Sequence, residues 1–221
     1  MGEPGRATRM PRDARRTQLL DAARSVFVSN GYHAAAMDDI AESAGVSKPV
    51  VYQHFGSKLD LYLALLDEST EALVVTVQNA IASTEENHSR VQAAVAAYFA
   101  FVDEGSEDFR LVFESDLGNI VEVRERLDQS ERACAAAIAA AIGEETGLSV
   151  AEAMLLGTAL AGTARVSAQA WLSAGRPFPR EHACELVIAL VWRGLAAFPV
   201  MPSPSPAGVP VGPASSGDPV R

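Results

Sequence analysis

Residues 36–58 constrain the fold of this chain more than any other stretch. They read AMDDIAESAGVSKPVVYQHFGSK, in which apolar residues at helical spacing precede Gly45, a residue that tolerates the positive φ of a helix end. Ser47 follows where a hydroxyl caps the next helix, and Pro49 falls in its first turn, where a missing N–H removes no helical bond. This pattern predicts two short helices joined by a tight turn, a helix-turn-helix.

The second short helix has one apolar side and one polar side. Val51 and Phe55, four residues apart, are predicted to face the core. The other positions mix cationic, amide, phenol and imidazole groups, which reach phosphates and base edges when such a helix lies in a major groove. The predicted DNA-contacting residues are Ser47, Lys48, Pro49, Val50, Tyr52, Gln53 and His54, with Lys58 at the start of the next helix facing the DNA backbone.

Individual roles follow from side-chain chemistry. Gln53 and Lys48 are expected at base edges, and Val50 at a thymine methyl group. Tyr52 and His54 are expected at phosphates. A tight helical corner in an ordinary all-helical protein is the alternative explanation of this stretch when it is considered alone.

The same stretch resembles the N-terminal domain of the tetracycline-repressor (TetR) family. The residues that carry the resemblance, in register, are Gly31-Tyr32, Ile40-Ala41, Ala44-Gly45-Val46-Ser47, Val51-Tyr52, His54-Phe55 and Ser57-Lys58. They cover roughly the first quarter of the chain. The resemblance implies a DNA-binding head followed by a helical bundle that encloses a small effector and forms a homodimer. Ala36 departs from the family pattern, which has a capping Thr there, and Asp38 and Asp39 would repel nearby phosphates.

The net charge of −10 argues at first against a DNA-binding protein, but its distribution reverses the argument. Residues 1–58 carry eight Lys or Arg and six Asp or Glu, a net +2, and the remainder carries −12. Both lysines of the chain flank the proposed recognition helix. A mildly basic head on an acidic body would orient the molecule on a polyanion. We expect no signal peptide and no membrane span, and hence a cytoplasmic protein.

The rest of the chain also predicts helices, so the fold class is all-α. Aromatic residues make up only 6% of the sequence and alanine is frequent, which favours helix packing over a β-sandwich. The expected long helices span 12–30, 58–83, 88–104, 107–115, 120–145, 150–173 and 179–197, which makes about nine with the two short ones. The expected division is a flexible arm (1–11), the DNA-binding domain (12–62), an effector-binding and dimerisation domain (63–198) and a disordered tail (199–221).

Two parts of this division have alternatives. Arg6 and Arg9 of the arm either lie along a minor groove of the DNA or belong to a disordered N-terminal segment without contacts. The second alternative is favoured. The last two helices are apolar over much of their circumference. The resemblance implies that they pair with a second copy in a four-helix bundle, and the alternative is that they are internal to a monomer.

An effector pocket, implied by the resemblance, would lie among the middle helices. The candidate lining residues are Tyr98, Phe99, Phe109, Phe113 and Trp171, and for each of them an ordinary core position is the alternative. An apolar wall with a few polar groups would suit a small lipophilic or aromatic effector. Cys134 and Cys184 lack metal-site spacing and are expected to be reduced, half-buried apolar groups. We find no nucleophile elbow, phosphate-binding loop or metal-ligand spacing, and therefore expect no enzymatic activity, metal or cofactor.

Two functions remain open at this stage. The first is a transcriptional repressor that a small-molecule effector releases from a palindromic operator. Its two recognition helices would enter successive major grooves about 34–36 Å apart. The second is a helical small-molecule-binding or scaffold protein with weak or lost operator binding. Ala36 and the acidic pair Asp38 and Asp39 motivate the second.

Overall fold

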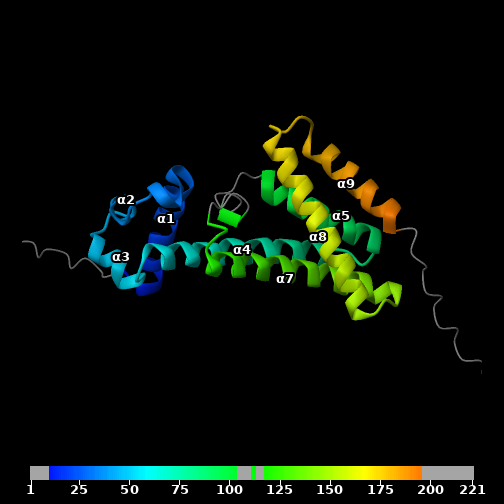
Figure 1. Cartoon of the computed structure of the whole chain (residues 1–221), viewed down its shortest axis with the longest axis horizontal. Helices are drawn as coiled ribbons and strands as arrows, with labels where there is room; N and C mark the ends of the chain where they lie inside the picture. The colour runs from blue at the N-terminus through cyan, green and yellow to red at the C-terminus, as the bar shows by residue number, and fades with distance from the viewer. Residues whose placement is uncertain (1–9, 104–110, 113–116, 196–221) are drawn as a thin grey trace, which may run out of the picture.

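The computed structural model describes residues 10–103, 111–112 and 117–195, and this part of the chain is entirely helical (Figure 1). Eight helices are assigned in it: α1 (Arg12–Ala34), α2 (Met37–Ser43), α3 (Lys48–His54), α4 (Lys58–Ala82), α5 (Asn87–Asp103), α7 (Val121–Thr146), α8 (Val150–Ser173) and α9 (Arg180–Leu195). The all-α prediction is confirmed. No helix among the described residues is long and apolar enough to cross a membrane.

The predicted helix bounds agree closely with the structure. Although α1 is assigned to Ala34, Gly31 inside it has φ 74°, so the regular helix ends at Asn30 as predicted. Most of the helix predicted at 107–115 lies outside the described residues, but Leu111 and Val112 are helical and buried. The arm except for its last two residues, and the whole of the tail at 199–221, also lie outside them.

Helices α1–α3 form a small head at one end of the molecule (Figure 1). Its core is apolar and includes the predicted inward residues Met37, Ile40, Ala41, Ala44, Val51 and Phe55, all of them buried. Two polar side chains of α1 hold the pair α2–α3 in place. Gln18 Nε2 donates to the carbonyl of Ala44 at the end of α2 (2.8 Å), and the guanidinium of Arg16 lies 4.6 Å from the centre of the Phe55 ring.

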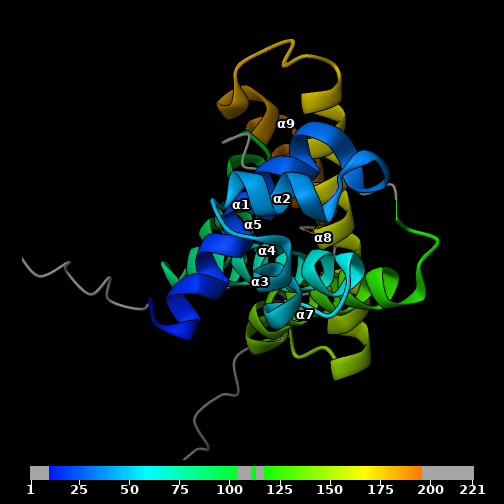
Figure 2. The same cartoon turned by 90° about the vertical axis from the view of Figure 1, so that its left-hand side faces the viewer.

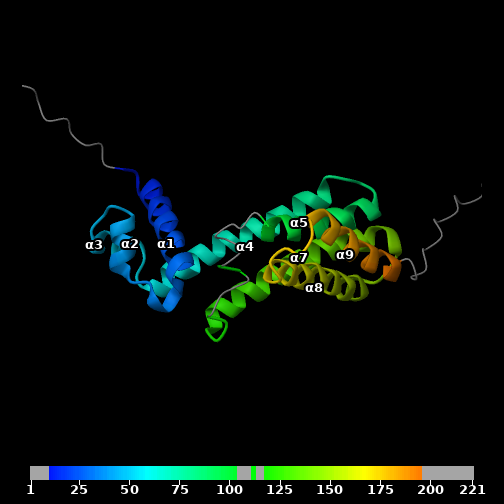
Figure 3. The ribbon, with the colours of Figure 1, turned by 90° about the horizontal axis from the view of Figure 1, so that it is seen from above.

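Helix α4 runs from the head into the body and packs on both (Figure 3). Ser57 caps its first turn, accepting the Asp60 N–H at 3.0 Å. Near the head, Tyr62 packs edge-on against Phe27 and Tyr32, with ring centroids 5.4 and 5.3 Å apart. Toward the body, the buried residues of α4 include Leu73, Val77 and Ile81. One continuous helix therefore connects the two hydrophobic regions.

The body is built around the packing of α7 against α8, which also contact α4 and α5, with α9 on the outside. A capping box at Ser149 and Glu152 begins α8, with the Ser149 N–H donating to the Glu152 carboxylate at 2.8 Å. At Gly157 the two helices approach so closely that a Cβ atom there would lie 2.4 Å from the carbonyl oxygen of Ala135 and 2.9 Å from the Cβ of Ala139. This glycine sets the separation of α7 and α8.

Replacing Gly157 with Ala is expected to force α7 and α8 apart and to lower the free energy of unfolding by about 1–3 kcal/mol. Gly162→Ala, the same change five residues along α8, is the matched control. A Cβ at Gly162 meets nothing within 4 Å, so alanine there should stabilise the helix by up to about 1 kcal/mol. Urea unfolding of both variants at one protein concentration measures the difference. Equal effects of the two substitutions would contradict the close approach at Gly157.

Candidate nucleic-acid interface and ligand cavity

Helix α3 begins differently from the prediction. Ser47 precedes it with an extended backbone, but its hydroxyl makes no capping bond, so the predicted side-chain cap is wrong. The second residue of the helix, Pro49, has no N–H to donate, and the N–H of the third, Val50, bonds instead to the Ser47 carbonyl at 2.9 Å. The two backbone donors that a cap would satisfy are therefore absent or occupied. Ser47 itself is exposed.

The predicted DNA-facing residues of α3 lie on its outer side. Val51 and Phe55 are buried, 0% and 3% exposed, and hold the helix on the head. Ser47, Lys48, Pro49, Tyr52 and Gln53 are exposed, and Val50 and His54 are half-buried. Figure 2 looks onto this end of the molecule, where α2 and α3 face the viewer with the body behind them. The polar groups of α3 are thus available to an outside partner.

Lys48 has a partner on the neighbouring helix. Its Nζ lies 2.9 Å from Oδ2 of Asp38 on α2, and both side chains are largely exposed. The hydrogen bond to Asp38 and the negative charge of that carboxylate raise the pKa of Lys48. Asp38 therefore neutralises this cation locally, and a phosphate or base that approached Lys48 would compete with an ion pair that water already weakens.

Lys58 has a different environment, which sequence reasoning missed. Its ammonium donates to the carbonyls of Tyr32 at 2.8 Å and Ala35 at 2.9 Å, with His33 at 3.4 Å, and it lies 4.4 Å from the centre of the Tyr32 ring. The side chain is half-buried. Lys58 thus ties the start of α4 to the chain that follows the regular part of α1. Its predicted DNA contact stays a prediction.

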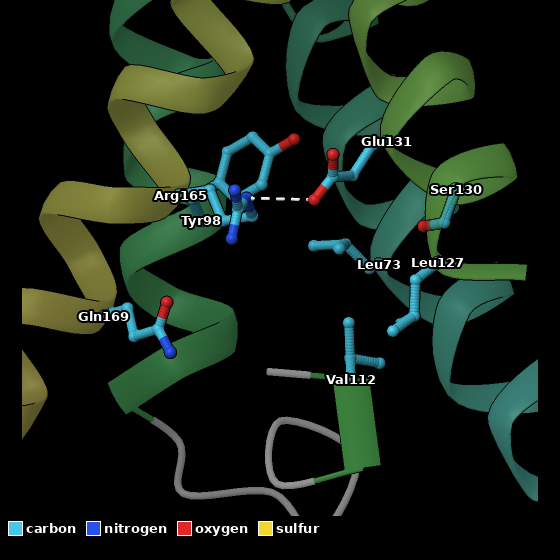
Figure 4. Close-up of a pocket in the computed structure, with 8 residues that line it drawn as sticks. All are labelled: Leu73, Tyr98, Val112, Leu127, Ser130, Glu131, Arg165 and Gln169. Carbon is cyan, nitrogen blue, oxygen red and sulfur yellow. Dashed lines mark ion pairs between the residues drawn. The ribbon is translucent and has the colours of Figure 1, made fainter. Parts of the chain in front are cut away.

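A cavity of about 220 Å³ lies in the body between α4, α5, α7 and α8, beside Val112 (Figure 4). Its lining residues are Leu73, Tyr98, Val112, Leu127, Ser130, Glu131, Arg165 and Gln169. An ion pair crosses it, with Arg165 Nε 3.2 Å from Glu131 Oε1. Three aliphatic side chains, one from each of three elements, line the cavity together with charged and hydroxyl groups. Such a lining suits an amphipathic small molecule.

The structure separates the predicted pocket residues. Tyr98 lines the cavity and is hydrogen-bonded to Cys134, and burial raises the pKa of both groups, which keeps both protonated near neutral pH. Phe99 and Trp171 are buried in the core with ring centroids 5.8 Å apart, and neither lines this cavity. Phe109 and Phe113 lie outside the described residues.

Sequence reasoning missed the charged part of the cavity. Arg165 is the one basic residue of the long and otherwise mostly apolar helix α8, which is the signal that would have marked it. Glu131 sits on α7 among several charged residues and has no such signal. The two cysteines are free, and both are buried where the sequence predicted half-buried positions. In the described ranges, no group of three or more His, Cys, Asp or Glu side chains is arranged to hold a metal ion.

The chain is similar in sequence to known proteins. Residues 19–65 match the family model described as bacterial regulatory proteins, tetR family. The transcriptional activator FasR of Mycolicibacterium smegmatis is 43% identical over 195 residues, which is 88% of this chain and 89% of its own. The chain belongs to the TetR family of bacterial regulatory proteins. It is therefore a DNA-binding transcriptional regulator of the helix-turn-helix type. Members of this family are regulators and not enzymes.

Solved TetR-like structures share the architecture of the whole molecule. The crystal structure of a TetR-like transcriptional regulator from Rhodococcus sp. RHA1 aligns with 86% of this chain and 100% of its own at a TM-score of 0.68 and 26% identity. The regulator FadR from Bacillus subtilis, solved in complex with stearoyl-CoA, aligns with 79% of this chain and 96% of its own at a TM-score of 0.66. At 20% identity, the FadR likeness concerns the fold alone.

The two lysines of this TetR-family head should respond differently to substitution. Lys58→Met leaves three carbonyls without their cation and should lower the free energy of unfolding by about 1–3 kcal/mol. Lys48→Met breaks only an exposed ion pair, so the unfolding midpoint should hardly change while DNA affinity falls. Urea unfolding and gel shifts of both variants test this contrast. A fully stable Lys58→Met protein would contradict the tethering role.

Proposed function

We propose that this protein activates transcription as a homodimer on a palindromic operator, and that a small effector bound in the body changes its DNA affinity. The supporting observation is the placement of α3, which is held by buried Val51 and Phe55 and presents Tyr52, 45% exposed, and Gln53 outward. Residues 12–62 act as the DNA-binding domain, and residues 63–198 bind the effector and form the dimer. Such a regulator works in the cytoplasm, where bacterial DNA lies.

The base-reading roles on α3 follow from chemistry and exposure. Gln53 has an amide that donates and accepts, which suits an adenine edge, and Lys48 suits a guanine edge once it leaves Asp38. Tyr52, His54 and Ser47 offer donors to phosphates, and Val50 and Pro49 offer apolar contacts beside them. Lys58 contributes chiefly by orienting the head, because its ammonium is already bound to carbonyls.

Dimerisation is supported by the surface of the last two helices. Large apolar side chains are exposed along them, namely Val150, Met154, Leu155, Val166, Leu186, Leu190 and Trp192. Leu155 and Leu190 are 70% and 69% exposed in the single chain. A second copy would cover this surface, and two-fold symmetry would present two α3 helices to the two halves of a palindromic site.

Effector control requires a mechanical connection between the cavity and the head, and α4 supplies one. Leu73 of α4 lines the cavity. Toward the head, Arg24 of α1 pairs with Glu68 of α4 at 3.0 Å, and Arg126 of α7 pairs with Asp67 of α4 at 2.7 Å. A ligand that moved α4 relative to α7 would move the head with it. The ligand can change the free energy of DNA binding only to the extent that it binds one arrangement of head and body more tightly than the other.

The direction of regulation follows from similarity. The sequence by itself favours repression. FasR, which is similar over most of this chain, is named a transcriptional activator. That similarity supports activation here.

Removing the side chains of Tyr52 and Gln53 together should abolish specific DNA binding without unfolding the head, because both are exposed. Loss of two polar contacts per half-site is expected to weaken binding by at least about 100-fold. The measurement is a gel shift on DNA that the wild-type protein selects from a random pool, together with a reporter driven by that DNA. Expression should fall for the variant relative to wild type.

Two outcomes would contradict the proposal, and one control variant accompanies them. Unchanged binding would favour the scaffold alternative. Increased reporter expression with lost binding would show repression instead of activation. The control Thr76→Ala changes an exposed residue of α4 far from α3 and should leave both readouts as in wild type.

Leu190→Glu should disrupt the proposed dimer by placing a charge in an interface that must be dry. Light scattering should give twice the chain mass of 23.3 kDa for wild type and one chain mass for the variant at micromolar concentration. Val75→Glu, which alters an exposed apolar residue of α4, is the matched control and should remain dimeric. A monomeric wild-type protein would refute this part of the proposal.

A further inference from the structure

The cavity of Figure 4 contains a charged pair whose two members are unequally exposed. The side chain of Arg165 is 31% exposed and that of Glu131 is 56% exposed. We propose that the natural ligand is an anionic amphiphile, a carboxylate with an apolar body, whose charged end replaces Glu131 on Arg165. This inference rests on the proposed function, since it takes the cavity to be the effector site.

The more exposed partner is the one that can be displaced. Glu131 can turn into water and recover its hydration, whereas Arg165 is the less exposed partner and lies close enough to Tyr98 to influence its pKa. An ion pair within reach of water contributes little on its own. A ligand carboxylate would replace the lost ion pair with its own pair to Arg165. Burial of its apolar body would add favourable binding free energy that Glu131 does not supply.

The Ser130 hydroxyl is a second hydrogen-bond donor in the cavity. Ser130 is 6% exposed, and its Oγ is the one buried side-chain oxygen or nitrogen among the described residues without a hydrogen-bond partner. Figure 4 shows this hydroxyl pointing from α7 toward the interior of the cavity. Buried polar groups in folded proteins are normally satisfied, so an orphan beside a cavity indicates a missing partner. Tyr98 is less available, because its hydroxyl is already bonded to Cys134.

The remaining walls define the body of the ligand. Leu73, Val112 and Leu127 come from three separate elements and offer aliphatic surface. The volume of about 220 Å³ lies below the roughly 300–1,000 Å³ that encloses drug-sized ligands, so a short or medium chain fits.

A second hollow of about 330 Å³ shares Tyr98, Glu131 and Arg165 with the first and is otherwise lined by α7 and α8. The ion pair therefore stands between two spaces. Arg132 also lines the second hollow. If the Glu131 side chain turned toward that hollow, its carboxylate would lie near Arg132, and the 220 Å³ cavity would be open to the ligand.

The test is calorimetric titration of the full-length protein with octanoate, with 1-octanol and octylammonium as neutral and cationic probes of the same chain length. Octanoate should bind and the other two should bind at least about tenfold more weakly. Arg165→Gln should weaken octanoate by at least about tenfold, and Ser130→Ala by about two- to fivefold. Glu131→Gln should tighten octanoate by about threefold or more, because it removes the internal competitor.

The opposite signs at the two ends of one ion pair separate a ligand site from a structural bridge. A structural bridge predicts that Arg165→Gln and Glu131→Gln both weaken binding, which would overturn the proposal. Preferential binding of octylammonium, or no binding of octanoate to the wild-type protein, would also overturn it. Glu144→Gln is the matched control, since it breaks the similarly exposed Arg90–Glu144 pair at 2.7 Å and should leave octanoate affinity unchanged.

Thermal melts and gel shifts without octanoate complete the design. Variants that retain the wild-type melting temperature and bind operator DNA report on the cavity alone. If octanoate fails to bind while the operator is still retained, the ligand class is wrong and the DNA-binding function stands. If operator binding is absent in the wild type, the proposed function fails whatever octanoate does.

Discussion

The structure depends on the burial of one helix, α4, against two hydrophobic regions. Tyr62 packs on Phe27 and Tyr32 in the head, and Leu73 and Val77 are buried in the body. Because α4 is continuous from Lys58 to Ala82, neither region can rotate about it without losing apolar contacts. The same rigidity makes α4 suited to convey a change in the body to the DNA-reading helix.

Polar contacts refine what this burial establishes, and the two lysines illustrate how differently one residue type acts. Lys58 donates to three carbonyls in the segment that follows the regular part of α1, so its charge serves the fold of the head. Lys48 pairs with Asp38 in water and remains exchangeable. In the sequence, the negative charge of Asp38 argues against DNA binding. In the structure, Asp38 forms an ion pair with Lys48, so its charge is balanced within the head. The acidic turn of α2 is compatible with a regulator.

Much of the fold was predictable because its signals are local. Helix bounds, the cap at Ser149 and the buried side of α3 follow from spacing and turn chemistry within a few residues. The Ser47 cap was predicted wrongly because Pro49 removes one donor and the backbone takes another, a competition within one turn that the cap rule ignores. Of the aromatic residues predicted for the pocket, Tyr98 lines the cavity, whereas Phe99 and Trp171 pack in the core because large rings fill helix interfaces.

The sequence by itself determined that this is an all-helical protein with a helix-turn-helix, and which side of α3 faces outward, since both follow from periodicity over short distances. Only the tertiary structure decided the partners of Lys58 and the cavity of Arg165, Glu131 and Ser130. These groups come from segments far apart in the chain, and Glu131 and Arg165 are brought together by the close packing of α7 on α8 at Gly157. No local pattern encodes such a meeting, because it depends on how whole helices fit together.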